Sequence, residues 1–126
     1  MTEEEIEKLS LQERKELAQS PNTPPQVLGI LAKDKDRVVR RGVPGNPNTS
    51  IQALDILAKD EDWGVRREVA ENPNTPSQVL DILAKDKDWV VRYKVAKHSK
   101  NITIDQLLIL GQDEDEEVRQ AALERI

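Results

Sequence analysis

Cysteine and phenylalanine are both absent from this 126-residue sequence. Without cysteine the chain forms neither disulfides nor thiolate-ligated clusters, so we expect no iron–sulfur cofactor. Apolar runs are short, as at 107–110, whereas a membrane-spanning helix needs about 20 apolar residues. Residues 1–7 are acidic and polar, unlike a secretory signal peptide. We expect a cytoplasmic protein that does not enter a membrane.

Aromatic side chains are equally scarce, since Trp63, Trp89 and Tyr93 are the complete set. Charged residues make up 34% of the chain, and the apolar residues are mainly aliphatic, a mixture that favours helices. The net charge is −5, and acidic residues concentrate at 1–20 and 113–124. Phosphate binding requires a positive surface, so this balance lowers the expectation of nucleic-acid binding. The two acidic ends favour a monomer.

A period of 26 residues runs through the sequence. Pro-Asn-Thr begins at positions 21, 47 and 73, and Leu-Ala-Lys-Asp begins at positions 31, 57 and 83. A fourth, divergent copy at 98–126 contains one inserted residue, because its Val-Arg pair follows the preceding pair by 27 positions. Self-similarity at a fixed period of this length is the signature of a repeat architecture.

The pattern of each repeat predicts two helices. In the third copy, Thr75 with Gln78 matches a capping box, and the pattern recurs at Thr49 with Gln52 and at Thr23 with Gln26. Pro24 and Pro76 would occupy the first helical position. The helix that follows, here called helix A, has apolar residues at helical spacing. A shorter helix B begins after an aspartate such as Asp88, and Asn-Pro ends it.

These units predict an all-α solenoid with about eight short helices. An N-terminal helical cap occupies 1–20, where Ser10 and Glu13 match a capping box before the second of two helices. Three repeats follow at 21–46, 47–72 and 73–97, and the divergent repeat fills 98–126. The chain is then a single domain of about four two-helix repeats.

The 26-residue unit resembles the leucine-rich repeat variant family. The resemblance is carried by Asn-Pro-Asn-Thr-Pro-Ser-Gln-Val-Leu-Asp-Ile-Leu-Ala-Lys-Asp at 72–86 and extends in register over 14–126. The Asp-x-x-Val-Arg element also resembles the second helix of HEAT-type repeats. The resemblance implies a right-handed superhelix in which some of the short helices are 3-10 helices. It implies a fold and leaves the activity open.

An arginine and an aspartate recur in every helix B. The structural interpretation is a ladder in which each arginine pairs with an aspartate at the start of a neighbouring helix B, and the alternative is a row of phosphate-binding cations. The structural interpretation is favoured, because a residue repeated in every unit is usually one that the stack itself needs. The proposed ladder consists of Arg40, Arg66, Arg92, Arg119, Asp36, Asp62, Asp88 and Asp115.

The positions of helix B that vary between repeats are the better candidates for binding. Residues four apart share a helix face, so all three aromatic side chains fall on one stripe together with arginines. Trp, Tyr and Arg are the residues most enriched at binding hot spots. The alternative role is packing between repeats, and the two roles are compatible. We call this candidate groove the aromatic stripe, and its members are Arg37, Arg41, Trp63, Arg67, Trp89 and Tyr93.

No motif in the sequence indicates catalysis or metal binding. The single histidine, His98, stands where other repeats have the asparagine that ends helix B. The acidic run at 113–117 lacks the glycine and the spacing of a calcium loop. We therefore expect no cofactor and no enzymatic activity. The sequence predicts a scaffold that binds a protein or peptide, with nucleic-acid binding through the helix-B arginines as the alternative.

Overall fold

The computed structural model describes residues 1–126 and contains ten α-helices and no strand. The four two-helix repeats account for the expected eight, and the two helices of the cap bring the total to ten. None of the ten is a 3-10 helix, which corrects that expectation. The helices are α1 (Glu3–Glu7), α2 (Leu11–Gln19), α3 (Pro25–Leu31), α4 (Arg37–Gly42), α5 (Ile51–Leu57), α6 (Trp63–Glu71), α7 (Ser77–Leu83), α8 (Trp89–His98), α9 (Ile104–Leu110) and α10 (Glu116–Leu123).

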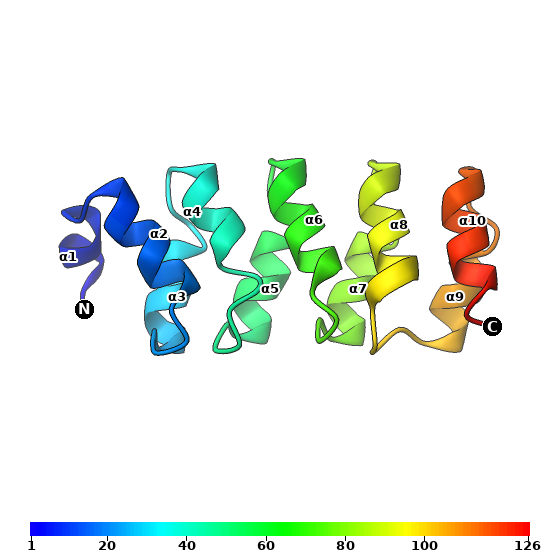
Figure 1. Cartoon of the computed structure of the whole chain (residues 1–126), viewed down its shortest axis with the longest axis horizontal. Coiled ribbons are helices and arrows are strands. Elements are labelled where there is room, and N and C mark those ends of the chain that lie inside the picture. The colour runs from blue at the N-terminus through cyan, green and yellow to red at the C-terminus, as the bar shows by residue number, and fades with distance from the viewer.

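The helices stack as a solenoid along the long axis of the molecule, with the two termini at opposite ends (Figure 1). Helices α2, α4, α6, α8 and α10 form one row, which we call the B row. Helices α3, α5, α7 and α9 form a second row behind it, which we call the A row. Because the two helices of a repeat run in opposite directions, the A-to-B loops lie at one edge and the B-to-A loops at the other.

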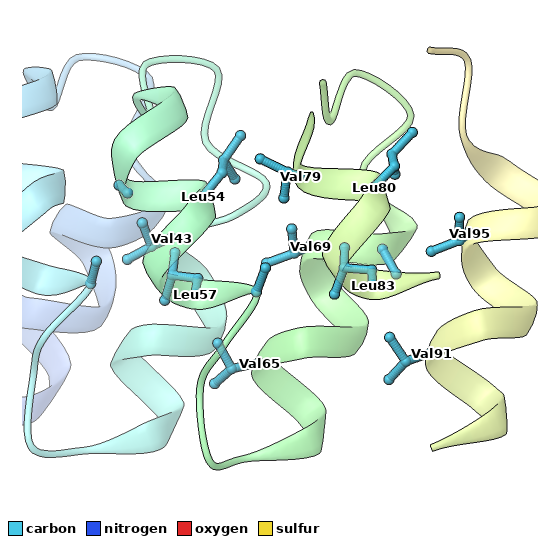
Figure 2. Close-up of a cluster of buried hydrophobic side chains, with 14 of the residues drawn as sticks. Val43, Leu54, Leu57, Val65, Val69, Val79, Leu80, Leu83, Val91 and Val95 are labelled. Carbon is cyan, nitrogen blue, oxygen red and sulfur yellow. The ribbon is translucent and has the colours of Figure 1, made fainter. Parts of the chain in front are cut away.

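The core lies between the two rows. Leucines of the A helices, such as Leu80 and Leu83, meet valines of the B helices, such as Val69 and Val95, and all four are inaccessible to solvent (Figure 2). A single continuous cluster of 26 buried apolar residues runs from the cap to the last repeat. Helices of five to ten residues are unstable alone, so this burial is what keeps them folded.

Aspartate caps begin every B helix after the cap segment. The carboxylate of Asp88 accepts a hydrogen bond from the backbone N–H of Val90, and Asp36, Asp62 and Asp115 cap α4, α6 and α10 in the same way. The capping box of Ser10 and Glu13 is also confirmed. The backbone N–H of Ser10, followed by its hydroxyl, lowers the pKa of the Glu13 carboxyl by hydrogen bonding to the ionised form.

The expected capping boxes at Thr23, Thr49 and Thr75 are wrong. Helices α3 and α7 start at Pro25 and Ser77, and Ser50 caps α5. Pro24 and Pro76 are therefore N-caps that make no side-chain capping bond, and not the first helical residues as predicted. The threonine hydroxyls instead donate to carbonyls near the end of the preceding helix. Thr75 donates to the carbonyl of Val69 at 2.7 Å, and the other two hydroxyls make the same contact six residues upstream at 2.6 Å. The last carbonyls of a helix lack partners within it, and here the threonine supplies one.

Side-chain amides connect neighbouring repeats at the B-to-A edge. The carboxamide of Asn46 donates to the carbonyls of Ala18 and Ser20 at 2.9 and 2.8 Å. Asn72 donates to Pro44 at 2.9 Å in the next unit. In the last repeat the guanidinium of Arg125 takes over this role. This edge of the solenoid is therefore held by hydrogen bonds to the backbone of the preceding repeat.

Leu80→Ala tests the assignment of the core. We expect it to lower the free energy of unfolding by about 2–5 kcal/mol, because truncation of a buried leucine removes apolar contacts and leaves a cavity. Urea denaturation followed by circular dichroism measures the change. Leu108→Ala is the matched control, since Leu108 is 50% exposed and its truncation should have little effect. Equal losses in the two variants would contradict the assignment.

Thr75→Val tests the backward threonine contact. Valine keeps the shape of the side chain and removes the hydroxyl that bonds the carbonyl of Val69. We expect the free energy of unfolding to fall by about 1 kcal/mol, as is typical when one buried hydrogen bond is lost. A urea midpoint identical to that of the wild type would show that the hydroxyl does not stabilise the turn.

Candidate functional site

The recurring arginines do form a ladder along the A-to-B edge. Arg14 reaches Asp34 at 2.9 Å, Arg40 reaches Asp60 at 2.8 Å, Arg66 reaches Asp86 at 2.7 Å, and Arg92 reaches Asp113 at 2.8 Å. Each aspartate belongs to the following repeat. Each of these arginines also donates through Nη1 to a backbone carbonyl in the loop that precedes its own helix, at 2.7–2.8 Å. One guanidinium thus connects two consecutive repeats.

The acidic partners differ from the predicted ones. The predicted aspartates at 36, 62, 88 and 115 cap the B helices. The arginines of the ladder bind the aspartates that lie two residues earlier in each repeat. These earlier aspartates also accept the backbone N–H of the capping residue, as Asp86 does from Asp88 at 2.9 Å. The ladder aspartate therefore fixes both the preceding arginine and the turn into its own helix B.

The ladder is largely shielded from water. The side chains of Arg66 and Asp86 are 7% and 6% exposed. The hydrogen bond to Asp113 raises the pKa of Arg92, outweighing the opposite effect of burial. At Asp113 burial raises the pKa, but the hydrogen bond from Arg92 and the backbone N–H of Asp115 outweigh it, and the pKa is lowered overall. Both shifts favour the charged forms of the pair.

Arg119 occupies the ladder position of the last repeat but has no carboxylate partner. It keeps only the bonds to its own loop, donating to the carbonyls of Asp113 at 2.7 Å and Glu114 at 3.0 Å. Of the four predicted ladder arginines, three are engaged at both ends and Arg119 at one.

The aromatic stripe runs over the outer side of the B row. Trp63 at the start of α6 and Trp89 at the start of α8 are 43% and 42% exposed, and these two helices pack directly against each other. The guanidinium of Arg67 lies over the ring of Trp63, 5.1 Å from its centroid. The ring of Tyr93 meets Trp89 edge to face, with centroids 6.2 Å apart. Roughly half of each indole is therefore covered by its neighbours and the other half faces solvent.

Arg41 is held across the junction between α4 and α6. It binds the capping carboxylate of Asp62 through two hydrogen bonds at 2.7 and 3.1 Å. This pairing raises the pKa of Arg41 and lowers the pKa of Asp62. The guanidinium lies against the backbone of Gly64, where an added Cβ would come within 2.5 Å of Nε. Glycine at this position makes room for the arginine. In contrast, Arg37 is exposed and has no carboxylate within reach.

A second surface, on the A row, was missed by the sequence analysis. Exposed isoleucines and leucines lie on it, with exposed fractions between 42% and 61% at Ile51, Ile56, Ile104, Leu108 and Ile109. The available signal was the recurrence of isoleucine at 30, 56, 82 and 109, which follows the repeat period. At its N-terminal end this surface is hollowed into a groove of about 750 Å³ between α1, α3 and α5.

These features define a helical repeat scaffold, in which a stack of two-helix units presents exposed side chains on both rows. Residues 63–88 match the model of the leucine rich repeat variant family. The match spans one full period, from the start of α6 to the residue before α8, and covers that one repeat of the chain. No curated protein and no solved structure matches the chain.

His98 ends α8 and is exposed. No three His, Cys, Asp or Glu side chains come together as a metal-binding group would. No helix has both the length and the apolar character needed to cross a lipid bilayer.

Arg66→Met tests the ladder while keeping the apolar stem of the side chain. We expect the free energy of unfolding to fall by about 3 kcal/mol, because the largely buried carboxylate of Asp86 loses its cationic partner. Urea denaturation measures the loss. Arg119→Met is the matched control at the same repeat position. It removes only bonds to the backbone, so we expect a loss of about 1 kcal/mol. Equal losses would contradict the ladder as the source of the stability.

Proposed function

We propose that this chain is a non-catalytic repeat scaffold of the cytoplasm that binds a protein or peptide partner through the aromatic stripe. The observation that carries the proposal is the placement of the two half-exposed tryptophans on adjacent, directly packed helices. Every aromatic side chain of the chain lies in this stripe. Tryptophan, tyrosine and arginine are the residues that dominate binding energy at protein interfaces.

The stripe is also held in place before any partner arrives. Trp63 is stacked under Arg67, and Trp89 is supported by Tyr93. Both tryptophans stand at the first position of a capped helix, directly after Asp62 and Asp88. Side chains that are already ordered lose little conformational entropy when they bind, and this favours affinity. Packing between repeats and contact with a partner are therefore compatible roles for the same indoles.

Nucleic-acid binding has less support. It would depend on the arginines of helix B, but Arg40, Arg66 and Arg92 already bind carboxylates and carbonyls within the solenoid. Elsewhere on the B row, Lys94 contacts Glu71 at 3.1 Å. Cations that are already paired release few counterions from a phosphate backbone, and the net charge of −5 opposes binding further. A protein partner is therefore the better proposal.

The test is capture of a partner on the immobilised chain at micromolar concentration, followed by measurement of its Kd. We expect Trp63→Ala and Trp89→Ala each to weaken binding by tenfold or more, because hot-spot truncations at interfaces cost about 2 kcal/mol or more. Ile104→Ala is the control, since Ile104 is 61% exposed on the other row and should change Kd by less than twofold.

Three results would contradict the proposal. The first is that no protein is retained from soluble extract. The second is that a retained protein binds the tryptophan variants as tightly as the wild type. The third is salt-dependent retention of labelled DNA or RNA in place of protein, which would favour the nucleic-acid alternative.

A further inference from the structure

The groove on the A row crosses three helices. One wall is α1, with Ile6 at its base, and the other is α5, which contributes Ala53 and Ile56, while α3 forms the floor. Its volume of about 750 Å³ lies within the range of ligand-binding clefts, which is about 300–1,000 Å³. The groove is separate from the aromatic stripe, because it is built from α1 and the A helices.

Gly29 is the reason that the floor is open. The same repeat position carries Asp55 in α5 and Asp81 in α7. At Gly29 the missing side chain leaves bare backbone, and a Cβ added there would meet no atom within 4 Å. The helix does not need glycine at this position, since its φ is not in the left-handed region and nothing crowds it. The substitution of aspartate by glycine therefore creates space without serving the packing of the stack.

The groove offers groups that suit a polypeptide main chain and an apolar side chain. Ile30 and Ile56 flank the glycine floor with apolar surface. Gln26 and Gln52 line the same groove, are exposed, and make no hydrogen bond within the chain. A carboxamide donates and accepts at once, so it pairs with the N–H and C=O groups of an extended segment.

The charges around the groove are separated. Arg14 and Asp34 neutralise each other at 2.9 Å, which leaves two free carboxylates and two free ammonium groups on the rim. The carboxylates, Glu3 and Glu7, are one turn apart on α1. The ammonium groups, Lys33 and Lys35, follow the end of α3. A complementary ligand therefore carries positive charge toward α1 and negative charge toward the loop after α3.

We propose that this groove binds an extended peptide segment that carries a basic residue, an apolar residue about three positions later and an acidic residue next to the apolar one. The apolar side chain sits on the floor at Gly29, and the basic one faces Glu7. The spacing follows from geometry, because packed helices lie about 8–10 Å apart and an extended chain advances about 3.3 Å per residue. The inference adds a second site to the proposed function, and rests on it only in that the ligand is a polypeptide.

The experiment is an NMR titration of the ¹⁵N-labelled chain with the capped peptide Gly-Arg-Ser-Ser-Leu-Glu-Ser-Gly. We expect chemical-shift changes confined to residues 3–7, 26–35 and 50–56. Gly29→Asp restores the side chain of the other repeats, and we expect it to weaken binding at least tenfold. Gly45→Asp is the matched control, because it adds the same charge at an exposed glycine with equal free space, in the turn after α4 and outside the groove. It should leave Kd within twofold of the wild type.

A charge exchange tests the orientation of the peptide in the groove. Glu7→Lys places a cation at the C-terminal end of α1, where the helix dipole favours it, so the helix should remain folded. We expect this variant to bind the peptide roughly fivefold more weakly, as for exposed ion pairs, and to regain affinity when the arginine of the peptide is replaced by glutamate.

Several outcomes overturn the inference. They are equal binding by Gly29→Asp and Gly45→Asp, no change on charge exchange, or the absence of any shift. Shifts at the indoles of Trp63 and Trp89 instead of at Gly29 would also overturn it, and would support the aromatic stripe. Failure at the groove is thus distinguished from failure of the proposed function, which the tryptophan variants and the captured partner decide.

Discussion

The hydrogen bonds of one guanidinium to two consecutive repeats are the interaction on which the solenoid depends. In a stack of two-helix units each repeat contacts only its neighbours, so each interface must be stable by itself. Arg66 illustrates the solution, because it binds a carbonyl of its own loop and the carboxylate of Asp86 in the next unit. That carboxylate in turn accepts the N–H of Asp88, the residue that caps the next helix B. Burial of valines and leucines supplies the stability, and these linked hydrogen bonds fix how successive repeats align.

The same hydrogen bonds determine which side chains remain free at the surface. Side chains that recur in every repeat are engaged within the stack, such as the ladder arginines and the backward threonines. The positions that differ between repeats include exposed side chains, such as Trp63 and Trp89 on the B row. Repetition therefore identifies the residues that hold the fold, and variation identifies the residues that distinguish its surfaces.

The sequence was sufficient for features that depend on local chemistry. The 26-residue period, the two helices per unit, the aspartate caps and the capping box at Ser10 follow from residue type and spacing. It was insufficient where two residues recur with the same period and only one of them makes the contact. Asp86 and Asp88 recur together, and only packing shows which one meets an arginine. Thr75 matched a capping box by spacing, but the helix begins one residue later and the hydroxyl points to the preceding helix. The groove at Gly29 depends on how the short helix α1 packs, and the repeat pattern carries no signal for that.

Three of the four junctions between consecutive units are held at both edges, by arginine and aspartate at one and by side-chain hydrogen bonds to backbone carbonyls at the other. At the junction of α6 with α8, His98 stands at the asparagine position and makes no such bond. At the other three, bending toward either edge must break hydrogen bonds, so the distance between equivalent side chains on successive repeats is nearly constant. Equivalent side chains at these junctions therefore recur along the solenoid at the fixed interval of one repeat.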